Sequence, residues 1–325
     1  PAVEYNGDLG HDELMDATLQ WLLEGDPAIR WQAERDLADL PEPIWHGSRM
    51  HVSQDGWGRD LLERQDPEGT WAGGLYTPKW TSTTYTMMLL RRLGLPSDHP
   101  QAHLACNVLL DRADWVEGGI SYFDSYTKRG WAERCVNGML LSIFSYFGVL
   151  GQRTDSIADL LINERMGDGG WNCEDKRGAT HSSFHTTISV LEGLLLWKRA
   201  TGRDDADNAL GAGHEFLLDH RMYRSHRTGA PINEAWTRFW FPPRWHYDIL
   251  RGLDHLQDAD VRPDKRARDA IDIVVDRRRS DGRWPKGSQY SGATFFPLEP
   301  GRVAGRWNTL RSLRVLRWWD SQPGS

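Results

Sequence analysis

Apolar residues along this chain gather in two alternating kinds of segment, and both have the spacing of an α-helix. In residues 155–198, aliphatic side chains at helical spacing precede a glycine-rich run, residues 166–170, that cannot continue a helix. Residues 188–197 are then apolar at intervals of three and four, around most of the helical circumference. A helix with this pattern is buried on several sides. The segment therefore predicts a hairpin of one half-exposed outer helix and one buried inner helix.

The hairpin pattern returns along almost the whole chain. A short phrase led by an aromatic residue marks each inner segment, and these aromatic residues are Trp31, Trp80, Trp131, Phe184, Trp245 and Trp307. The intervals between them are 49, 51, 53, 61 and 62 residues, so six units fit the 325 residues. Self-similarity at such a period indicates an array of similar supersecondary units.

Helical hairpins in a row either stack as an open solenoid or close into a ring. The period near 50 residues exceeds that of the usual solenoid hairpin, and long aromatic loops precede the inner segments; both features favour closure. We therefore predict an all-α protein, an α/α toroid of about six helical hairpins in two concentric rings. In this prediction residues 1–325 form a single domain, with residues 1–14 as an N-terminal extension.

In a closed ring the inner helices run parallel, so their N-termini meet at one mouth. Unpaired N–H groups and the positive ends of the helix dipoles favour an anion at such a place. Basic residues stand beside or near the aromatic residue in most units, and these are Arg30, Lys79, Arg134, Arg244 and Arg306. We therefore expect the mouth to bind the anionic head group of a substrate.

The aromatic residues at the same mouth allow two interpretations. Their rings could line a hydrophobic cavity, in which π faces stabilise a cation, or they could pack a repeat core. The hydroxyl-bearing side chains within residues 81–85 favour a cavity, because a packed core excludes so many hydroxyls. The expected substrate-binding aromatic residues are Trp80, Tyr85, Trp131, Phe184, Trp245 and Trp307.

Two of the repeated turns resemble those of a known superfamily. Residues 61–71 read Leu-Leu-x-x-Gln-x-x-x-Gly-x-Trp, which is similar to the Gln-Trp repeat of squalene and oxidosqualene cyclases. Residues 169–172, Gly-Gly-Trp-Asn, resemble the repeats of protein prenyltransferase β subunits. The chain thus resembles the terpenoid cyclase / protein prenyltransferase superfamily over residues 15–320, which implies an α/α toroid and isoprenoid chemistry of the transferase or cyclase type. The sequence lacks the Asp-x-Asp-Asp box of class II triterpene cyclases, which argues against hopanoid synthesis.

The resemblance also implies a zinc site. Protein prenyltransferases hold zinc with an Asp-x-Cys segment at one inner helix and a histidine on a later one, near a basic cluster for the diphosphate. Residues 133–135, Glu-Arg-Cys, and residues 184–186, Phe-His-Thr, are similar to these segments, and Lys128 and Arg129 would bind the diphosphate. The sequence departs from the pattern in having Glu133 in place of Asp, and it carries no sign of the α subunit that the eukaryotic enzymes require.

The repeat itself predicts that metal-binding side chains come together. His185 and His246 each follow the aromatic residue of their unit, and Cys135 lies one helical turn from the equivalent position of the preceding unit. A thiolate and two imidazoles suit zinc and leave one coordination position open, and Asp248 or Glu133 would complete the site or act as a catalytic base. Alternatively, the cysteine is an inert core residue and the histidines are only hydrogen-bonded. A rival ligand set in one loop consists of Cys173, Asp175, His181 and His185.

The composition excludes some partners. The formal net charge is −7 and the longest basic run is residues 277–279, so we expect no binding of nucleic acid. The three cysteines lack Cys-x-x-Cys spacing, which is typical of a reducing compartment and predicts a cytoplasmic protein. Because no window approaches the roughly 18 apolar residues of a membrane-spanning helix, we expect no transmembrane segment.

Three functions remain open at this stage. The first is a prenyltransferase-like or terpene-cyclase-like enzyme that acts, with or without zinc, on an isoprenoid or other small apolar molecule with an anionic head group. The second is a carbohydrate-active α/α-barrel hydrolase or lyase with Asp175, Glu234 and Asp248 as acid and base. The third is a non-catalytic repeat protein that binds a lipid or a peptide in its bowl. We favour the first, and the sequence identifies neither the substrate nor a protein partner.

Overall fold

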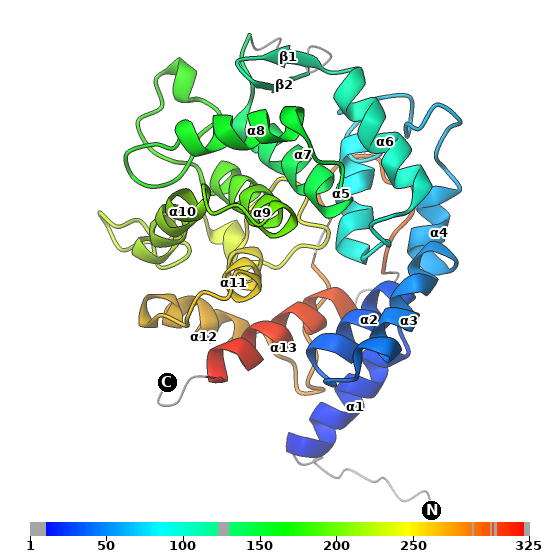
Figure 1. The fold of residues 1–325 in the computed structure, drawn as a ribbon. Helices are drawn as coiled ribbons and strands as arrows, with labels where there is room; N and C mark the ends of the chain where they lie inside the picture. Colours follow the sequence, from blue (N-terminus) through cyan, green and yellow to red (C-terminus); the bar gives the residue numbers. More distant parts are fainter. Residues whose placement is uncertain (1–10, 123–129, 288, 300, 302–303, 322–325) are drawn as a thin grey trace, which may run out of the picture.

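The computed structural model describes residues 11–122, 130–287, 289–299, 301 and 304–321, and this part of the chain is built mainly from helices (Figure 1). The inner helices of the described part are α2 (Pro27–Asp36), α5 (Thr83–Leu93), α7 (Arg134–Tyr146), α9 (Phe184–Thr201), α11 (Ile249–Asp258) and α13 (Arg306–Asp320). The outer helices are α1 (His11–Leu23), α4 (Gly56–Leu62), α6 (Pro100–Asp111), α8 (Gln152–Asn163), α10 (Asp207–Asp219) and α12 (Arg268–Asp276). Figure 1 looks along the axis of the ring and shows the outer helices around the inner ones. The prediction of an all-α fold with two concentric rings is confirmed.

Contacts between successive inner helices close the ring. They run from α5 through α7, α9, α11 and α13 to α2. Between α2 and α5, the Trp31 indole donates to the Leu93 carbonyl (2.9 Å) and the Gln32 amide donates to the Arg92 carbonyl (3.2 Å). The first and last inner helices are therefore both joined to their neighbours, as a toroid requires and an open solenoid does not.

The closest approach within the ring is that of α7 and α9, and it depends on two glycines. A Cβ atom added at Gly138 would lie 2.5 Å from the Ser189 carbonyl oxygen, and one added at Gly193 would lie 2.5 Å from the Gly138 carbonyl oxygen. Any larger residue would therefore push the two backbones apart. This tight pair brings the N-terminal ends of α7 and α9 side by side.

Three of the repeated turns are fixed by the same two hydrogen bonds. In each, a buried indole donates to a carbonyl in the last turn of the preceding outer helix: Trp71 to Leu61 (2.7 Å), Trp171 to Leu161 (2.6 Å) and Trp284 to Val274 (2.7 Å). The backbone N–H of the same tryptophan donates to a threonine hydroxyl in the first turn of the inner helix: Thr83 (3.1 Å), Thr187 (3.0 Å) and Thr309 (3.0 Å). The turn thus ties the end of one helix to the beginning of the next.

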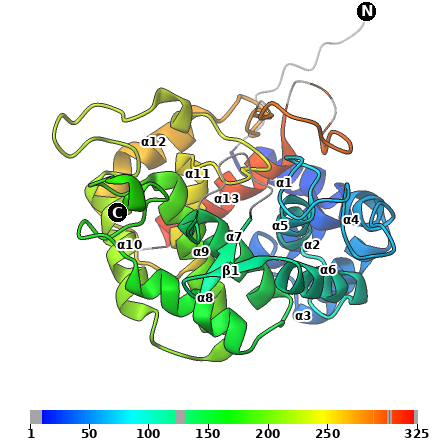
Figure 2. The same cartoon turned by 90° about the horizontal axis from the view of Figure 1, so that it is seen from above.

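The remaining elements lie in the connections. Helix α3 (Glu42–Met50) and the 3-10 turn η1 (His51–Ser53) join α2 to α4, and strands β1 (Asp114–Val116) and β2 (Gly119–Ser121) pair antiparallel ahead of α7. Further 3-10 turns are η2 (Asp175–Arg177), η3 (Glu234–Thr237) and η4 (Lys265–Ala267). Figure 2 shows the long connections into α11 and α13 gathered on one side of the ring. That side carries the N-terminal ends of the inner helices.

The structure bears on two expectations, that of an N-terminal extension and that of no transmembrane segment. Helix α1 begins at His11 and packs on α2, so the last part of the expected N-terminal extension is already helical, and residues 1–10 lie outside the described part. Within the described ranges, none of the helices combines the length and the apolar character needed to cross a bilayer.

Candidate functional site

Two cysteines from neighbouring units meet at the N-terminal ends of α7 and α9. Cys135 is the second residue of α7, and Cys173 lies two residues after Trp171, on the loop that leads to α9. The backbone N–H of Cys135 donates to the Cys173 sulfur (3.2 Å), and the Thr186 hydroxyl donates to the same sulfur (3.5 Å). Both cysteines are free thiols. The fixed turn at Trp171 therefore delivers Cys173 to the beginning of α7.

Glu133, the N-cap residue of α7, completes a three-residue cluster with the two cysteines. A carboxylate oxygen of Glu133 and the sulfurs of Cys135 and Cys173 all lie within 4.8 Å of one another. In the part of the chain that the structure describes, no other group of three or more His, Cys, Asp or Glu side chains brings its donor atoms so close. Two sulfurs and one carboxylate oxygen form a donor set that zinc accepts, and a three-ligand site leaves one position open. We call these three residues the thiol cluster.

The two sulfurs of the thiol cluster differ in acidity. The hydrogen bond from Cys135 lowers the pKa of Cys173, and the hydrogen bond from Thr186 acts in the same direction, while burial opposes both. The pKa of Cys135 is raised, first by its hydrogen bond to Cys173 and then by burial. Cys173 is therefore the sulfur that loses its proton first, and the thiolate is the form that binds metals and attacks electrophiles.

One lysine lies beside the thiol cluster. The Lys79 ammonium stands over the Tyr76 ring (5.1 Å to the centroid) and the Trp245 ring (5.8 Å). Burial lowers the pKa of Lys79, while its electrostatic interactions with Cys135 and Glu133 act in the opposite direction. Lys79 is thus a cation that interacts electrostatically with the cluster, at the mouth where an anionic head group was expected.

Other basic residues predicted for the mouth hold the fold together. Arg30 donates to the Leu23 carbonyl (2.8 Å) and Arg306 donates to the Trp21 carbonyl (3.0 Å). Arg134 is fully buried and forms ion pairs with Glu164 (2.9 Å) and Asp175 (2.8 Å). These contacts explain why cations recur near the beginnings of inner helices without any ligand. Lys128 and Arg129, the predicted diphosphate ligands, lie outside the described residues.

The structure brings His185 and His246 together, but not with Cys135 at the spacing of a metal site. The two imidazole centroids are 5.6 Å apart. His185 Nδ1 accepts from the backbone N–H of Tyr247 (2.8 Å), and the His246 ring is stacked between the rings of Trp245 and Tyr290, at 3.7 Å from each. Both histidines therefore have packing and hydrogen-bonding roles, and the donor set that does converge combines Cys135 with Glu133 and Cys173.

The reason lies in where the aromatic phrase falls in each unit. Trp131 lies three residues before α7, Phe184 is the first residue of α9, and Trp245 lies four residues before α11. The residues that follow these aromatic residues are consequently not at equivalent helical positions, and His246 lies on a loop. Equal spacing in sequence did not translate into equal placement at the mouth.

The predicted catalytic base Asp248 is a buried helix cap. Its carboxylate accepts from the backbone N–H groups of Arg251 (2.8 Å) and Trp240 (3.2 Å), and none of its surface is exposed. Burial raises its pKa, against the opposing effect of Arg311. In the rival loop set, Asp175 is engaged by Arg134. These partners give both carboxylates a role in the fold, whereas Glu133 belongs to the thiol cluster.

The aromatic residues predicted to line a cavity mostly pack against other rings. Phe184 contacts Phe216, Trp236 and Tyr247, with centroids 4.7–4.9 Å apart. Trp80 meets Tyr85 edge to face (4.8 Å), Trp307 stacks on Phe241 (4.0 Å), Trp245 stacks on His246 (3.7 Å) and Trp131 lies under the Arg177 guanidinium (5.4 Å). Loop rings such as those of Phe241 and Tyr290 therefore occupy space that a repeat of hairpins alone would leave open.

Comparisons with known proteins give a limited match among solved structures. No protein-family model matches the sequence, and no curated protein matches it. Among solved structures, the chain is similar to the apo form of the type II terpene cyclase MstE from Scytonema, with 18% identity over 84% of this chain and 81% of that chain and a TM-score of 0.43. An apo point variant of the same cyclase gives 20% identity over 84% and 79% of the two chains, with a TM-score of 0.44.

Proposed function

We propose that this protein is a zinc-assisted enzyme of the prenyltransferase or terpene-cyclase type, which acts at the mouth of the toroid on an apolar substrate with an anionic head group. The observation that carries the proposal is the convergence of Glu133, Cys135 and Cys173 within 4.8 Å. The chemistry of the donor set supports zinc, because thiolates are soft ligands and a carboxylate is a common third one. The isoprenoid class of substrate is an extension from the resemblance of the repeated turns.

The residues around the thiol cluster would divide the work. A bound zinc ion supplies a Lewis acid and lowers the pKa of a water or thiol in its open position. Glu133, Cys135 and Cys173 would hold that ion, and Lys79 would attract the anionic head group. The N-terminal ends of α7 and α9 add the positive ends of their dipoles at the same place. The rings of Tyr76 and Trp245, which face the Lys79 ammonium, offer an apolar surface to the rest of the substrate.

The carbohydrate alternative receives less support from the same contacts. Two of its three carboxylates, Asp175 and Asp248, are engaged by Arg134 and by backbone N–H groups, respectively. A glycosidase needs two carboxyl groups free to face one glycosidic bond. A non-catalytic bowl would not need an acidic thiol beside a carboxylate. Both alternatives serve as outcomes of the experiments below.

The first experiment measures zinc in protein purified without chelator, together with the variants Cys173→Ala and Cys106→Ala. Cys106 is the matched control, because it is a fully buried free cysteine on α6 whose thiol pKa is raised by burial. We expect about one zinc ion per chain in the wild type and in Cys106→Ala. We expect zinc binding to be weakened at least about tenfold in Cys173→Ala, because one of three ligands is lost. Equal zinc content in all three proteins, or none in any, would contradict the zinc part of the proposal.

The second experiment addresses the substrate. Purified protein loaded with zinc is incubated with prenyl diphosphates of several lengths and, separately, with oligosaccharides, and the products are followed by mass spectrometry. We expect turnover of a prenyl diphosphate that falls in Cys173→Ala and in Lys79→Gln but not in Cys106→Ala. Turnover of an oligosaccharide would support the carbohydrate alternative, and tight binding without turnover would support a non-catalytic bowl.

A further inference from the structure

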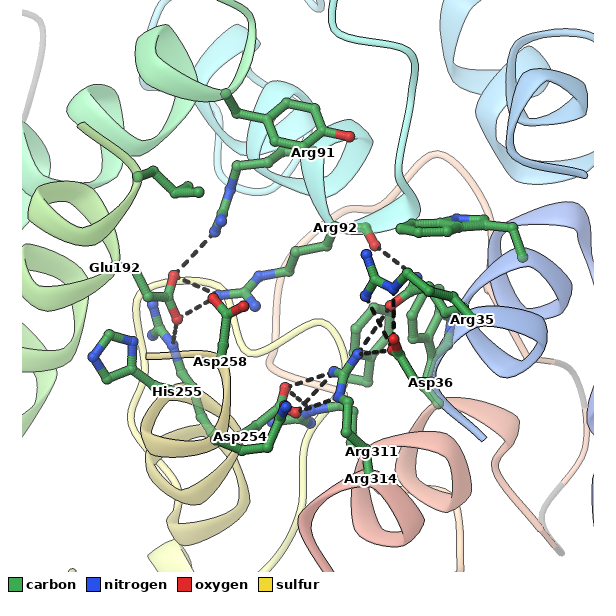
Figure 3. A pocket seen from close by; sticks show the side chains of 18 of the residues that line it. Arg35, Asp36, Arg91, Arg92, Glu192, Asp254, His255, Asp258, Arg311 and Arg314 are labelled. Carbon is green, nitrogen blue, oxygen red and sulfur yellow. Dashed lines mark hydrogen bonds and ion pairs between the residues drawn. The ribbon is translucent and has the colours of Figure 1, made fainter. Parts of the chain in front are cut away.

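A cavity apart from the thiol cluster lies among the inner helices, and most of its lining residues are in their C-terminal halves (Figure 3). It has a volume of about 290 Å³ and is lined by side chains of α2, α5, α7, α9, α11 and α13 and of the loop into α11, none of which belongs to the thiol cluster. Seven arginines and four carboxylates are among the described residues that line it. Burial lowers the pKa of the lining His255 to about 4, so that side chain is neutral at pH 7. The walls therefore carry three more positive than negative charges.

The carboxylates of this cavity are already shared among several arginines. Glu192 on α9 accepts from Arg91 (3.0 Å), Arg92 (2.8 Å) and Arg251 (2.8 Å), and Figure 3 shows the two α5 arginines reaching across to it. Asp254 on α11 likewise pairs with the α13 residue Arg314 (2.8 Å). A carboxylate with three cationic partners cannot satisfy every donor that these partners present.

Several buried nitrogen atoms on the lining residues lack a hydrogen-bond partner. They are Arg91 Nε, Arg251 Nη2, Arg311 Nη2 and the indole nitrogen of Trp307, and all of them are donors. Arg251 is 1% exposed and Arg311 is 3% exposed, so water does not readily serve these groups. The Asp248 carboxylate lies 4.0 Å from Arg311 Nη2, which is too far for a hydrogen bond. Unpaired buried donors of charged groups are costly, and an additional acceptor would remove that cost.

The helix dipoles do not account for this excess of positive charge. The C-terminal ends of inner helices point toward this side and attract cations in their last turns. Arg251, however, is the third residue of α11, and Arg311 is the sixth of the fifteen residues of α13. Neither position is near a helix C-terminus. Arg251 and Arg311 have carboxylate partners in Glu192 (2.8 Å) and Asp254 (3.5 Å), and each keeps one Nη2 donor that an added acceptor would satisfy.

We propose that this cavity binds a phosphate-type oxyanion, such as diphosphate or a small organic phosphate, with Arg91, Arg92 and Arg251 as its main ligands. Guanidinium groups recognise such anions with paired N–H donors, and several oxygen acceptors on one ligand match several unpaired donors. The cavity is also lined by the stacked rings of Phe241 and Trp307, which leave an apolar wall for an organic group beside the anion. The site is separate from the thiol cluster and does not depend on zinc.

Isothermal titration with inorganic diphosphate at constant ionic strength tests this proposal. The variants are Arg92→Gln and Arg91→Gln, with Arg203→Gln as the matched control, since Arg203 is also paired to a carboxylate (Asp205, 2.6 Å) but is 43% exposed and does not line the cavity. We expect Kd to rise at least about tenfold in Arg92→Gln and Arg91→Gln, because each loses charge-assisted hydrogen bonds, and to stay unchanged in the control. Circular dichroism checks that each variant is folded.

A rim variant keeps the test informative if the buried variants fail to fold. The side chain of Arg35 is 42% exposed, so Arg35→Gln should fold and should weaken diphosphate binding about threefold through the loss of one nearby charge. Lack of diphosphate binding by the wild type would overturn the proposal. So would binding that survives all three cavity substitutions and disappears in Lys79→Gln, because the anion site would then be at the mouth. A Cys173→Ala protein that loses zinc but keeps diphosphate binding would separate this inference from the proposed function.

Discussion

Replacing Thr187 by valine probes the hydrogen bond that fixes the repeated turns of the ring. The substitution keeps the shape of the side chain and removes the hydroxyl that accepts from the Trp171 backbone N–H (3.0 Å). Both residues are fully buried, so water cannot replace the lost acceptor. An unpaired buried N–H costs about 1–3 kcal/mol, and removal of the buried hydroxyl offsets part of that cost. We therefore expect the free energy of unfolding to fall by about 1–2 kcal/mol.

The same hydrogen bond from a tryptophan N–H to a threonine hydroxyl occurs in two other turns, so the stability losses of the three variants can be ranked. Thr309→Val removes the acceptor for Trp284 in the same way, so its cost should be close to that of Thr187→Val. Thr83→Val should cost more, because the Thr83 hydroxyl also donates to the Gly74 carbonyl at 2.7 Å, whereas the Thr187 hydroxyl donates to the Trp171 carbonyl at the longer distance of 3.4 Å. Thr201→Val, at the C-terminal end of α9, is the control. The Thr201 hydroxyl also bonds the Trp197 carbonyl (2.8 Å) and the Arg203 N–H (3.3 Å), but the residue is only half-buried, so water can replace these bonds and the cost should be less than about 0.5 kcal/mol.

Urea unfolding followed by far-ultraviolet circular dichroism measures these differences. The dependence of the unfolding free energy on urea should be the same for all four variants, so that shifts in midpoint report stability. The reasoning would be refuted if Thr187→Val, Thr309→Val and Thr83→Val lost no more stability than Thr201→Val. It would also be refuted if Thr83→Val were the least affected of the three.

Three further predictions concern buried charges and histidines. Arg134→Met leaves the Asp175 carboxylate without its ion pair, so we expect the free energy of unfolding to fall by about 3–5 kcal/mol. We also expect faster proteolysis of the loop that carries Asp175, and unchanged cleavage would show that the ion pair does not hold this loop in place. Glu192→Gln removes the negative charge that three buried arginines share, and we expect thermal unfolding to show a similar decrease in stability. A gain in stability would mean that the arginines move into solvent and do not need this partner. His255, 3.1 Å from His214, has its pKa lowered to about 4 by burial, so the unfolded chain binds the proton more readily and stability should fall as the pH drops from about 6.5 toward 4. The variant His255→Gln should lose less stability over that range in urea titrations, and a pH dependence equal to that of the wild type would contradict the assignment.

The thiol cluster shows how far a candidate site could be predicted. Glu133 and Cys135 stand out in the sequence, because residues 133–135 resemble the Asp-x-Cys segment that holds zinc in protein prenyltransferases. Cys173 became part of the site only through the turn at Trp171, and Trp171 belongs to a repeated turn that could have pointed to it. The prediction of His185 and His246 as ligands relied on equal placement of the aromatic phrases, and the helices begin at different points relative to those phrases.

The sequence by itself determined the helices and their order in hairpins, and its repeat length favoured a ring over an open solenoid. These features depend on local periodicity and on a repeat length, and both are properties of short stretches of chain. Only the tertiary structure decided which side chains meet, because those contacts join distant residues: Cys135 and Cys173 are 38 residues apart, and Arg314 reaches Asp36 across 278 residues. The loops into α11 and α13 follow no repeat, yet their rings fill the interior and Phe241 lines the arginine-rich cavity. Packing of such aperiodic segments depends on the shape of the whole ring, and that shape does not exist until the chain has folded.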